Sequence, residues 1–588
     1  MEETKINNAL ESKSTIMNDD DKVMARMGYK QELYRGFSAF MNFSFCFTAV
    51  AVISSITLLF SYGLTTGGPV IMVWGWIIGS FFSIIVGLSL GEICSSYPSA
   101  GSVYHWAGML ANEKLAPIAS YYCGWFNFIG NAAGDASFAF AFAQMIAATI
   151  SLNNDYNYTL PVEYQTAIAI GVAFLWAIKN MMRIDHQGWF NNFSGVYQII
   201  STIVIIITIL AAAQILSTND FVWFQYLNGT GFVNLKTGQD DGSTKLYLCC
   251  IGLLMCLFSF AGYEGAAHMA EETTNASTAA PKGIIFTTIA TAITGFAYLL
   301  GLLYATGCAD ELCIDNKILN GNSANPTVNV FSNAFTKFDG SGNVISYSKA
   351  GALIMAILIL INLFFAGFSS MTVTSRAGYA MARDGAFPGS KFLSTVTEKN
   401  KVPVKMIILV FIIVSLLCLL PLQSMAPPYS TIAFAAITGI TTIGYQISYM
   451  IPILLRVTVS RNTFVKSTVN LGPFSIIIGW VSVCWLFMTS CFFLFPNQFN
   501  EDLQQTATIF NYTCAVVGLV LIVASIYWFL PKSCGGARHF FTGPKRTNND
   551  INDADEIQKI ELQRDPTLRE NGVKLDNPTD TIKVMINH

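Results

Sequence analysis

Two acidic residues lie inside long apolar stretches, where a charge is chemically conspicuous. Glu264 ends the run Phe258–Glu264, and Asp135 lies in the small-residue run Gly130–Ser137. An ionisable side chain within a membrane span costs about 2.5–3.5 kcal/mol on insertion scales, so it usually serves a partner, a substrate or a proton. Glu264 could balance a substrate ammonium group or carry a proton, or it could pair with His268 or a tyrosine. Asp135 could act in transport or hold two helices together through a hydrogen bond.

Short polar runs interrupt two of the apolar stretches. One is Ile53–Thr57, with three hydroxyl residues in five positions, and the other is Phe258–Glu264, where Gly262 gives the backbone freedom. Transport sites form where a helix breaks near the bilayer midplane and its unpaired backbone groups face a cavity. Ordinary close packing of helices is the alternative, because Ser, Thr and Gly also line such contacts. The two breaks predict substrate-binding residues, namely Ser54, Ser55, Ile56, Thr57, Phe260, Ala261, Gly262, Tyr263 and Glu264.

Hydroxyl residues also gather in a later apolar stretch, at Ser369 and Ser370 and at the threonines that follow them. Their oxygens could serve a sodium ion together with the first break, or they could bond back to their own helix. We therefore take Asp135, Glu264, Ser369 and Ser370 as candidate coupling or gating residues.

The apolar composition of the chain indicates that membrane-spanning helices position these residues. Hydrophobic residues make up 53% of the 588 and charged residues 12%, about half the charged share of soluble domains. A membrane-spanning helix needs about 20 apolar residues. Twelve stretches qualify: 37–62, 69–91, 117–150, 164–183, 191–216, 246–268, 283–307, 350–375, 404–424, 430–454, 473–495 and 508–530. The sequence predicts an all-α polytopic membrane protein, with a polar head (1–35), a transmembrane domain (36–530) and a polar tail (531–588).

The basic residues predict the orientation. With the amino terminus inside, 28 of the 33 Lys and Arg residues fall on the cytoplasmic side, as the positive-inside rule requires. Both termini are therefore expected in the cytoplasm, with the plasma membrane as the first expectation and a vacuolar or other internal membrane as the alternative. Cys308 and Cys313 begin the longest outer loop, and a disulfide between them is one of two open possibilities.

Three separated motifs resemble one known group of transporters. They are Ser95-Ser96-Tyr97-Pro98-Ser99-Ala100-Gly101, then Gly262-Tyr263-Glu264-x-x-x-His268-Met269-x-Glu271-Glu272, then Ser375-Arg376-x-x-Tyr379-Ala380-x-Ala382-Arg383-Asp384-Gly385-Ala386-x-Pro388. Together they resemble the amino acid/polyamine/organocation superfamily, in particular its amino acid/choline transporter branch. The resemblance implies a LeuT-like fold, with two inverted repeats of five helices plus two peripheral helices, and transport by alternating access. It also implies a substrate carboxylate at the first break and the substrate body at the sixth.

The resulting functional expectation is a secondary active transporter for amino acids or a related small amine such as GABA. A choline or polyamine permease is an alternative, and a non-transporting nutrient sensor on the same fold is an alternative of another class. The resemblance favours a proton as the coupling ion, with sodium or exchange still open. Enzymatic activity, a cofactor and a metal site are not expected, because the sequence has no Walker loop and no metal-spaced Cys and His residues.

Overall fold

The computed structural model describes most of the chain between the two polar ends. The described residues are 33–182, 184–233, 239–319, 321, 323, 325–338, 344–398, 400–423, 429–497, 499, 510–541, 543 and 544. The predicted head and tail therefore lie outside the described residues, apart from 33–35 and from 531–541, 543 and 544.

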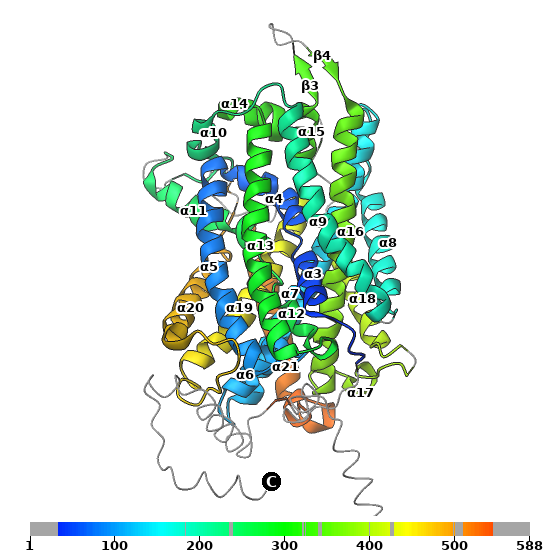
Figure 1. Ribbon diagram of the computed structural model, residues 1–588, viewed down its shortest axis with the longest axis vertical. Coiled ribbons are helices and arrows are strands. Elements are labelled where there is room, and N and C mark those ends of the chain that lie inside the picture. The colour runs from blue at the N-terminus through cyan, green and yellow to red at the C-terminus, as the bar shows by residue number, and fades with distance from the viewer. Residues whose placement is uncertain are drawn as a thin grey trace, which may run out of the picture.

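Each of the twelve predicted spans corresponds to one helix or to two helices joined by a break (Figure 1). They are α3 (Ala39–Val50) with α4 (Val52–Thr65), α5 (Gly68–Ser96), α7 (Ala116–Asn153), α8 (Val162–Asn180), α9 (Ile184–Ala212), α11 (Gly242–Ser259) with α12 (Gly265–His268), α13 (Ala276–Ala305), α16 (Lys349–Arg383), α18 (Val404–Cys418), α19 (Tyr429–Val457), α20 (Ser475–Phe492) and α21 (Tyr512–Phe529). Within the described residues, ten helices are long and apolar enough to cross a membrane, and α8 and α19 occupy the two other predicted spans. The all-α polytopic fold is confirmed.

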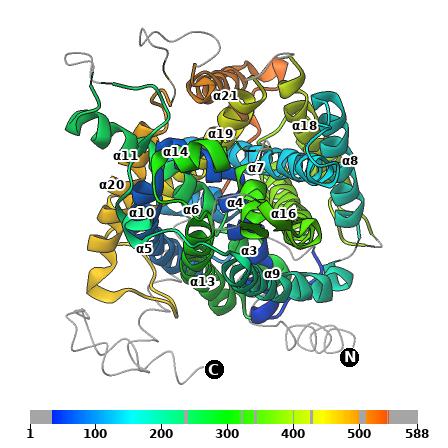
Figure 2. The same ribbon diagram turned by 90° about the horizontal axis from the view of Figure 1, so that it is seen from above.

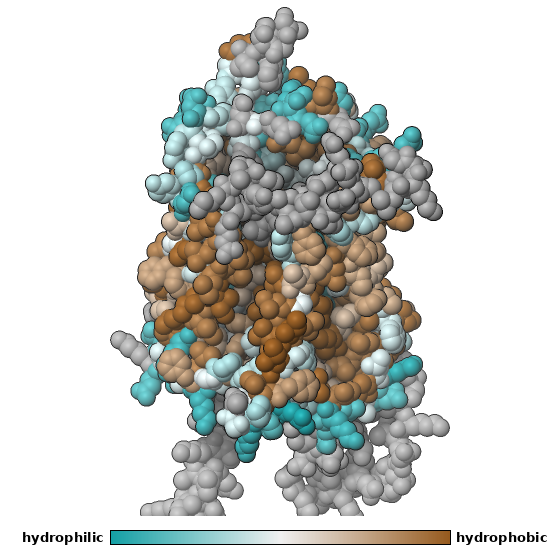
Figure 3. All heavy atoms as spheres, turned by 180° about the vertical axis from the view of Figure 1, so that it is seen from behind, coloured by the Kyte–Doolittle hydropathy of each residue, from teal (hydrophilic) through white to brown (hydrophobic). Residues whose placement is uncertain are grey.

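The outer surface of the bundle is apolar around its middle. Large hydrophobic side chains such as Phe81, Ile207, Ile293 and Phe487 are more than half exposed. On the face drawn in Figure 3, a brown apolar band lies between two hydrophilic ends. Such a continuous apolar surface is unfavourable in water and is what a lipid bilayer covers.

Short elements close the two ends of the bundle. One end, here called the α15 end, carries α10 (Asn219–Phe224), α14 (Glu311–Cys313), the π-helical turn η2 (Ile314–Leu319), α15 (Pro326–Ala334), the antiparallel pair β1 (Thr66–Gly67) and β2 (Leu227–Asn228), and the antiparallel pair β3 (Thr336–Phe338) and β4 (Val344–Tyr347). The opposite end, the α6 end, carries α6 (Ser102–Leu110) and α17 (Ser390–Leu393). The remaining short turns are η1 (Ala270–Glu272), η3 (Leu420–Gln423), η4 (Gly472–Phe474), η5 (Lys532–Cys534) and η6 (Ala537–His539). At the α15 end Cys308 and Cys313 form a disulfide, which settles the question that the sequence left open.

The helices pack around α7, which runs through the centre and contacts both α16 and α19 (Figure 2). The second span, α5, packs against the seventh, α13, and the third, α7, against the eighth, α16. In the expected inverted repeat, the members of each pair would be equivalent helices of the two five-helix halves. α20 and α21 lie at the periphery (Figure 2).

Candidate functional site

The first span breaks at Ala51, a single residue between α3 and α4. Its φ is 49°, in the left-handed region that costs an L-residue roughly 1–2 kcal/mol. The break lies two residues before the predicted run Ile53–Thr57, which instead forms the start of α4. The prediction of this position was wrong because it followed the hydroxyl groups, whereas alanine is a strong helix former and gives no local sign of a break.

The predicted residues of the first break are all buried, but their side chains are bonded differently. The Ser55 hydroxyl donates to the carbonyl of Val50 at 3.3 Å, and the Thr57 hydroxyl shares a 2.8 Å hydrogen bond with that of Tyr298. Ile56 is fully buried. The Ser54 hydroxyl is 1% exposed and has no hydrogen-bond partner among the described residues. It stands in the first turn of α4, where backbone N–H groups lack intrahelical acceptors and the helix dipole is positive.

The sixth span breaks over Phe260–Glu264, between α11 and α12, where the sequence predicted it. Gly262 has a φ of +90°, and a Cβ at this position would lie 3.3 Å from the Tyr445 hydroxyl oxygen. The Gly262 N–H donates to the Tyr449 hydroxyl at 3.1 Å. Glycine is therefore required here both by the backbone angle and by the close approach of α19.

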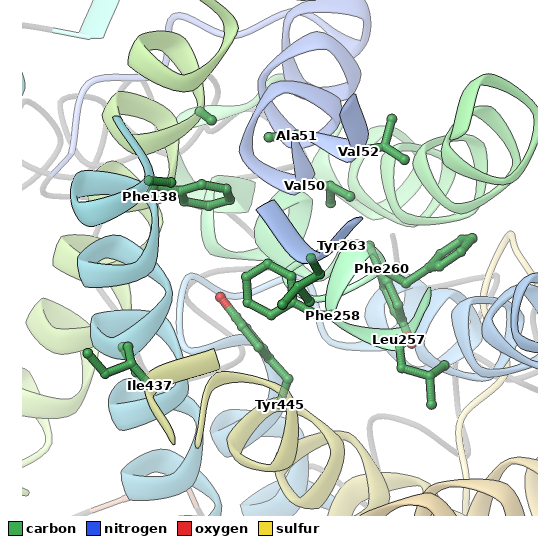
Figure 4. Close-up of a cluster of buried hydrophobic side chains, with 14 of the residues drawn as sticks. Val50, Ala51, Val52, Phe138, Leu257, Phe258, Phe260, Tyr263, Ile437 and Tyr445 are labelled. Carbon is green, nitrogen blue, oxygen red and sulfur yellow. The ribbon is translucent and has the colours of Figure 1, made fainter. Parts of the chain in front are cut away.

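The two broken helices contact each other directly. The Cys46 thiol of α3 donates to the carbonyl of Tyr263 at 3.1 Å, and the Asn42 side-chain amide donates to the carbonyl of Ala266 at 2.9 Å. Figure 4 shows side chains from both breaks, with Phe138 of α7 and Tyr445 of α19, around a common centre. The folded chain thus brings together the two interruptions, which lie about 210 residues apart in sequence.

Glu264 is fully buried beside this centre and is bonded by protein groups on both carboxylate oxygens. The Asn127 amide of α7 donates to Oε1 at 2.9 Å, and the Tyr449 hydroxyl of α19 donates to Oε2. Oε1 also lies 3.8 Å from Nε2 of His268. Pairing with His268 and with a tyrosine was one of the alternatives for Glu264, and the structure shows both contacts.

A small cavity lies against the sixth break on the side of α19 and α20. Its lining residues are Ser83, Val86, Leu257, Phe260, Ala261, Tyr263, Thr442, Tyr445, Gln446, Tyr449, Trp485 and Leu486. Sequence reasoning missed the contribution of α19. The signal was present in the four-residue spacing of Tyr445 and Tyr449, which places both phenols on one helical face.

Asp135 lies apart from Glu264, in a contact between α7 and α16. The Ser370 hydroxyl donates to one of its carboxylate oxygens, and the Thr374 hydroxyl donates to the other at 2.7 Å. Ser369 is fully buried, and its hydroxyl has no hydrogen-bond partner among the described residues. The geometry of Asp135 fits the interhelical hydrogen bond that was one of its two predicted roles.

Below the sixth break, the α6 end is closed by two buried ion pairs. Arg376 Nε lies 2.8 Å from Glu272 Oε1, and Arg383 contacts both carboxylate oxygens of Glu271 at 3.2 Å. The chain before α3 adds a third contact, because the N–H groups of Gly36 and Phe37 donate to the carbonyl of Glu272. Both glutamates are 2% exposed, so they are buried ion-pair partners at this end of the bundle and are not solvated.

His105 of α6 lies in the same region, outside the spanning helices. Burial and, to a smaller extent, the positive charge of Arg383 together lower the pKa of His105 to about 3. The neutral form of this imidazole is therefore the one packed beneath the site.

Comparison with known proteins relates the chain to transporters. A family model described as "Amino acid permease" matches residues 40–521. "Amino-acid permease BAT1" of Arabidopsis thaliana is 35% identical over 535 residues, 90% of this chain and 97% of that protein. Its homolog in Oryza sativa subsp. japonica is 33% identical over 528 residues, 89% and 94% of the two chains. "Amino-acid permease 2" of Neurospora crassa is 26% identical over 524 residues, 89% of each chain.

Proposed function

This chain belongs to the amino acid permease family, and we propose that it is a secondary active carrier of amino acids that works by alternating access. The observation that supports this most is the contact between two broken membrane helices in the middle of the bundle. Unpaired polar groups at this depth are costly in lipid and are tolerated where they face a substrate cavity.

The first break is the proposed site for the substrate carboxylate. The first-turn N–H groups of α4 and the unpartnered, buried Ser54 hydroxyl are hydrogen-bond donors at the positive end of a 14-residue helix. Within the predicted set, Ser54 is the best candidate for direct contact, because Ser55 and Thr57 already bond to protein groups. Ile56 would contribute apolar packing.

The sixth break is the proposed site for the rest of the substrate. Phe260, Ala261, Gly262 and Tyr263 form the interrupted segment, and three of them line the adjacent cavity. Glu264 lies next to them, but both of its oxygens accept hydrogen bonds from protein donors. We therefore assign Glu264 a supporting and charge-carrying role beside the substrate in place of a direct ligand role.

Alternating access requires that one side of the site be closed while the other opens. The two ion pairs and the contacts of the segment before α3 are the proposed closure of the α6 end. The proposed orientation places the α6 end in the cytoplasm, because the basic residues concentrate there. The proposed location is the plasma membrane.

The substrate within this class is proposed to be an amino acid or GABA, since the first break offers donors to a carboxylate. Choline and polyamines lack that carboxylate and would depend on aromatic and acidic walls. A nutrient sensor on this fold would bind the same ligands without moving them.

The test is uptake of labelled alanine, glutamate, arginine, GABA, choline and putrescine by cells that express the chain at the membrane. We expect saturable uptake of a carboxylate-bearing probe. Ser54→Ala should raise its KM by about tenfold through the loss of one hydrogen bond to a charged group, with Ser55→Ala as the matched control. Uptake of choline or putrescine alone would contradict the carboxylate site. Binding without uptake would favour the sensor.

A further inference from the structure

The imidazole of His268 has one bonded nitrogen and one unbonded nitrogen, and both are buried. Nδ1 lies 2.8 Å from the backbone carbonyl oxygen of Ala100. A carbonyl can only accept, so Nδ1 must carry a hydrogen in either charge state of the ring. This bond fixes the tautomer and leaves Nε2 as the only position on His268 where a proton can be gained or lost.

Nε2 of His268 faces a carboxylate with no proton donor between them. It has no hydrogen-bond partner among the described residues and lies 3.8 Å from Oε1 of Glu264. If the histidine is neutral and the glutamate is ionised, two lone pairs face each other in a fully buried place. Burial of the unsatisfied Nε2 acceptor is unfavourable, and one added proton would bond Nε2 to Oε1 and remove the repulsion between the facing lone pairs.

The other oxygen of Glu264 is held differently. Oε2 accepts from the Tyr449 hydroxyl, and that hydroxyl in turn accepts from the N–H of Gly262. The phenolic hydrogen is therefore committed to Oε2, and an added proton has its place at Oε1, opposite Nε2. The pair offers one proton position, and that position is one residue from the interrupted substrate segment.

On these grounds we propose that Glu264 and His268 together bind a single proton, and that this proton is the coupling ion of the carrier; the inference rests on the proposed transport function. Proton uptake converts the facing lone pairs into one N–H···O or N···H–O hydrogen bond, without breaking any covalent bond. The net charge of the pair changes from −1 to 0.

The same histidine connects the pair to the closed α6 end. Ala100, whose carbonyl oxygen bonds Nδ1, donates its own N–H to Oε1 of Glu271 at 3.2 Å. Glu271 is the partner of Arg383 on α16. The two ion pairs at the α6 end, Glu271–Arg383 and Glu272–Arg376, are here called the gate. A change in the position of the imidazole reaches the first of them through the single residue Ala100. This gives a physical route from proton binding to opening of the α6 end.

Other titratable and charged groups lie around the Glu264–His268 pair, and each is a possible alternative site for the proton. They are Cys46 on α3, Cys123 and Asp135 on α7, Tyr263 in the break, Tyr445 and Tyr449 on α19, His105 on α6, and the pairs Glu271–Arg383 and Glu272–Arg376. Phenols and thiols ordinarily titrate above neutral pH, and the two gate carboxylates have arginine partners. Asp135, bonded by two hydroxyls of α16, is the competing proton site.

The test uses the full chain reconstituted into lipid vesicles, with labelled alanine, glutamate, arginine and GABA as probes. Counterflow at equal pH on both sides measures carrier activity, and accumulation under a pH gradient measures coupling. For one coupled proton, each pH unit of gradient should support about tenfold accumulation of a probe whose net charge does not change. A pH dye trapped in the vesicles should report one proton entering per molecule of probe.

The decisive variants are His268→Gln and Asp135→Asn. We expect His268→Gln to lose gradient-driven accumulation and the pH dependence of counterflow, while counterflow itself is still measurable. Gradient-driven accumulation by His268→Gln, or its selective loss in Asp135→Asn, would overturn the proposal. Should His268→Gln not fold, the dye measurement on the unaltered chain decides, because counterflow without proton entry contradicts the proton site alone. Absence of both counterflow and uptake for every probe would contradict the carrier function itself.

Discussion

The two broken helices meet at one site but are built in opposite ways. The first break is a single left-handed residue, Ala51, followed by the 14-residue helix α4. The sixth break extends over five residues around Gly262, and only the four-residue helix α12 follows it. Beyond α12, His268, Glu271 and Glu272 connect the break to the α6 end.

This difference separates two tasks that a carrier must perform. A long helix that begins at a sharp break presents a fixed set of N–H donors, which suits the recognition of an anionic group. A longer interruption around a glycine, followed by a short helix, can transmit movement to the ion pairs at the α6 end. We therefore interpret the first break as the binding element and the sixth as the coupling element.

The largest effect should follow from breaking the gate below the sixth break. Arg376→Met leaves the carboxylate of Glu272 buried without its cation, which costs roughly 3–5 kcal/mol. We expect a strong loss of folded protein, measured by size-exclusion chromatography and the thermal midpoint in detergent. The double variant Arg376→Met with Glu272→Leu removes both charges and should recover much of the midpoint. If Arg376→Met melts like the unaltered chain, the gate does not depend on this pair.

The packing of α6 beneath the sixth break should be sensitive to pH. The folded state holds the pKa of His105 at about 3, below the ordinary value of 6.5, so below pH 6.5 the unfolded chain binds a proton that the folded chain does not. The contribution of neutral His105 to stability is complete above pH 6.5 and declines by up to about 1.4 kcal/mol for each pH unit below it. The thermal midpoint measured at pH 7, 6 and 5 should fall, and His105→Gln should flatten that decline. Equal slopes for the two proteins would contradict this assignment.

The hydroxyl of Tyr449 holds the sixth break to α19, and its removal tests the coupling element. Tyr449→Phe removes the donor to Glu264 and the acceptor of the Gly262 N–H, at a cost of about 1–3 kcal/mol in a buried place. We expect a fall of about tenfold or more in kcat/KM for uptake. Tyr445→Phe is the matched control, because the Tyr445 hydroxyl donates to Oδ1 of Asn131 at 2.8 Å, whereas that of Tyr449 donates to Glu264. Equal kcat/KM values for the two variants would contradict a specific role of the Tyr449 hydroxyl in transport.

The smallest effects are expected when alanine and glycine are exchanged between the two breaks. Gly262→Ala places a side chain at a φ of +90° and should cost about 1–2 kcal/mol. Ala51→Gly relieves a left-handed alanine at a φ of 49° and should leave the thermal midpoint equal or slightly higher. Thermal midpoints and uptake rates of the two variants measure the contrast. A loss of uptake in Ala51→Gly despite normal stability would show that the first break needs rigidity for binding.

Much of this architecture was readable from the sequence. The twelve apolar stretches predict the spans because the bilayer sets both the length and the polarity of a crossing helix. The sixth break was readable from Gly262 beside Glu264, since a glycine and an acid in an apolar span are both locally unusual. The first break was misplaced by two residues because Ala51, an alanine in the left-handed region, has no local signal in the sequence.

The sequence by itself determined the all-α membrane fold, the approximate positions of the two breaks and the identity of the buried acids. The bilayer acts on each segment separately, so hydropathy along the chain is sufficient for those features. Only the tertiary structure decided that Tyr449 and Asn127 hold Glu264, that Ser370 and Thr374 hold Asp135, and that Nε2 of His268 faces a carboxylate. The contacts of Tyr449, Asn127, Ser370 and Thr374 join residues more than a hundred positions apart, and helix packing, which no local pattern specifies, chooses these partners. His268 lies only four residues from Glu264, but the carbonyl of Ala100 that orients its ring lies 168 positions away.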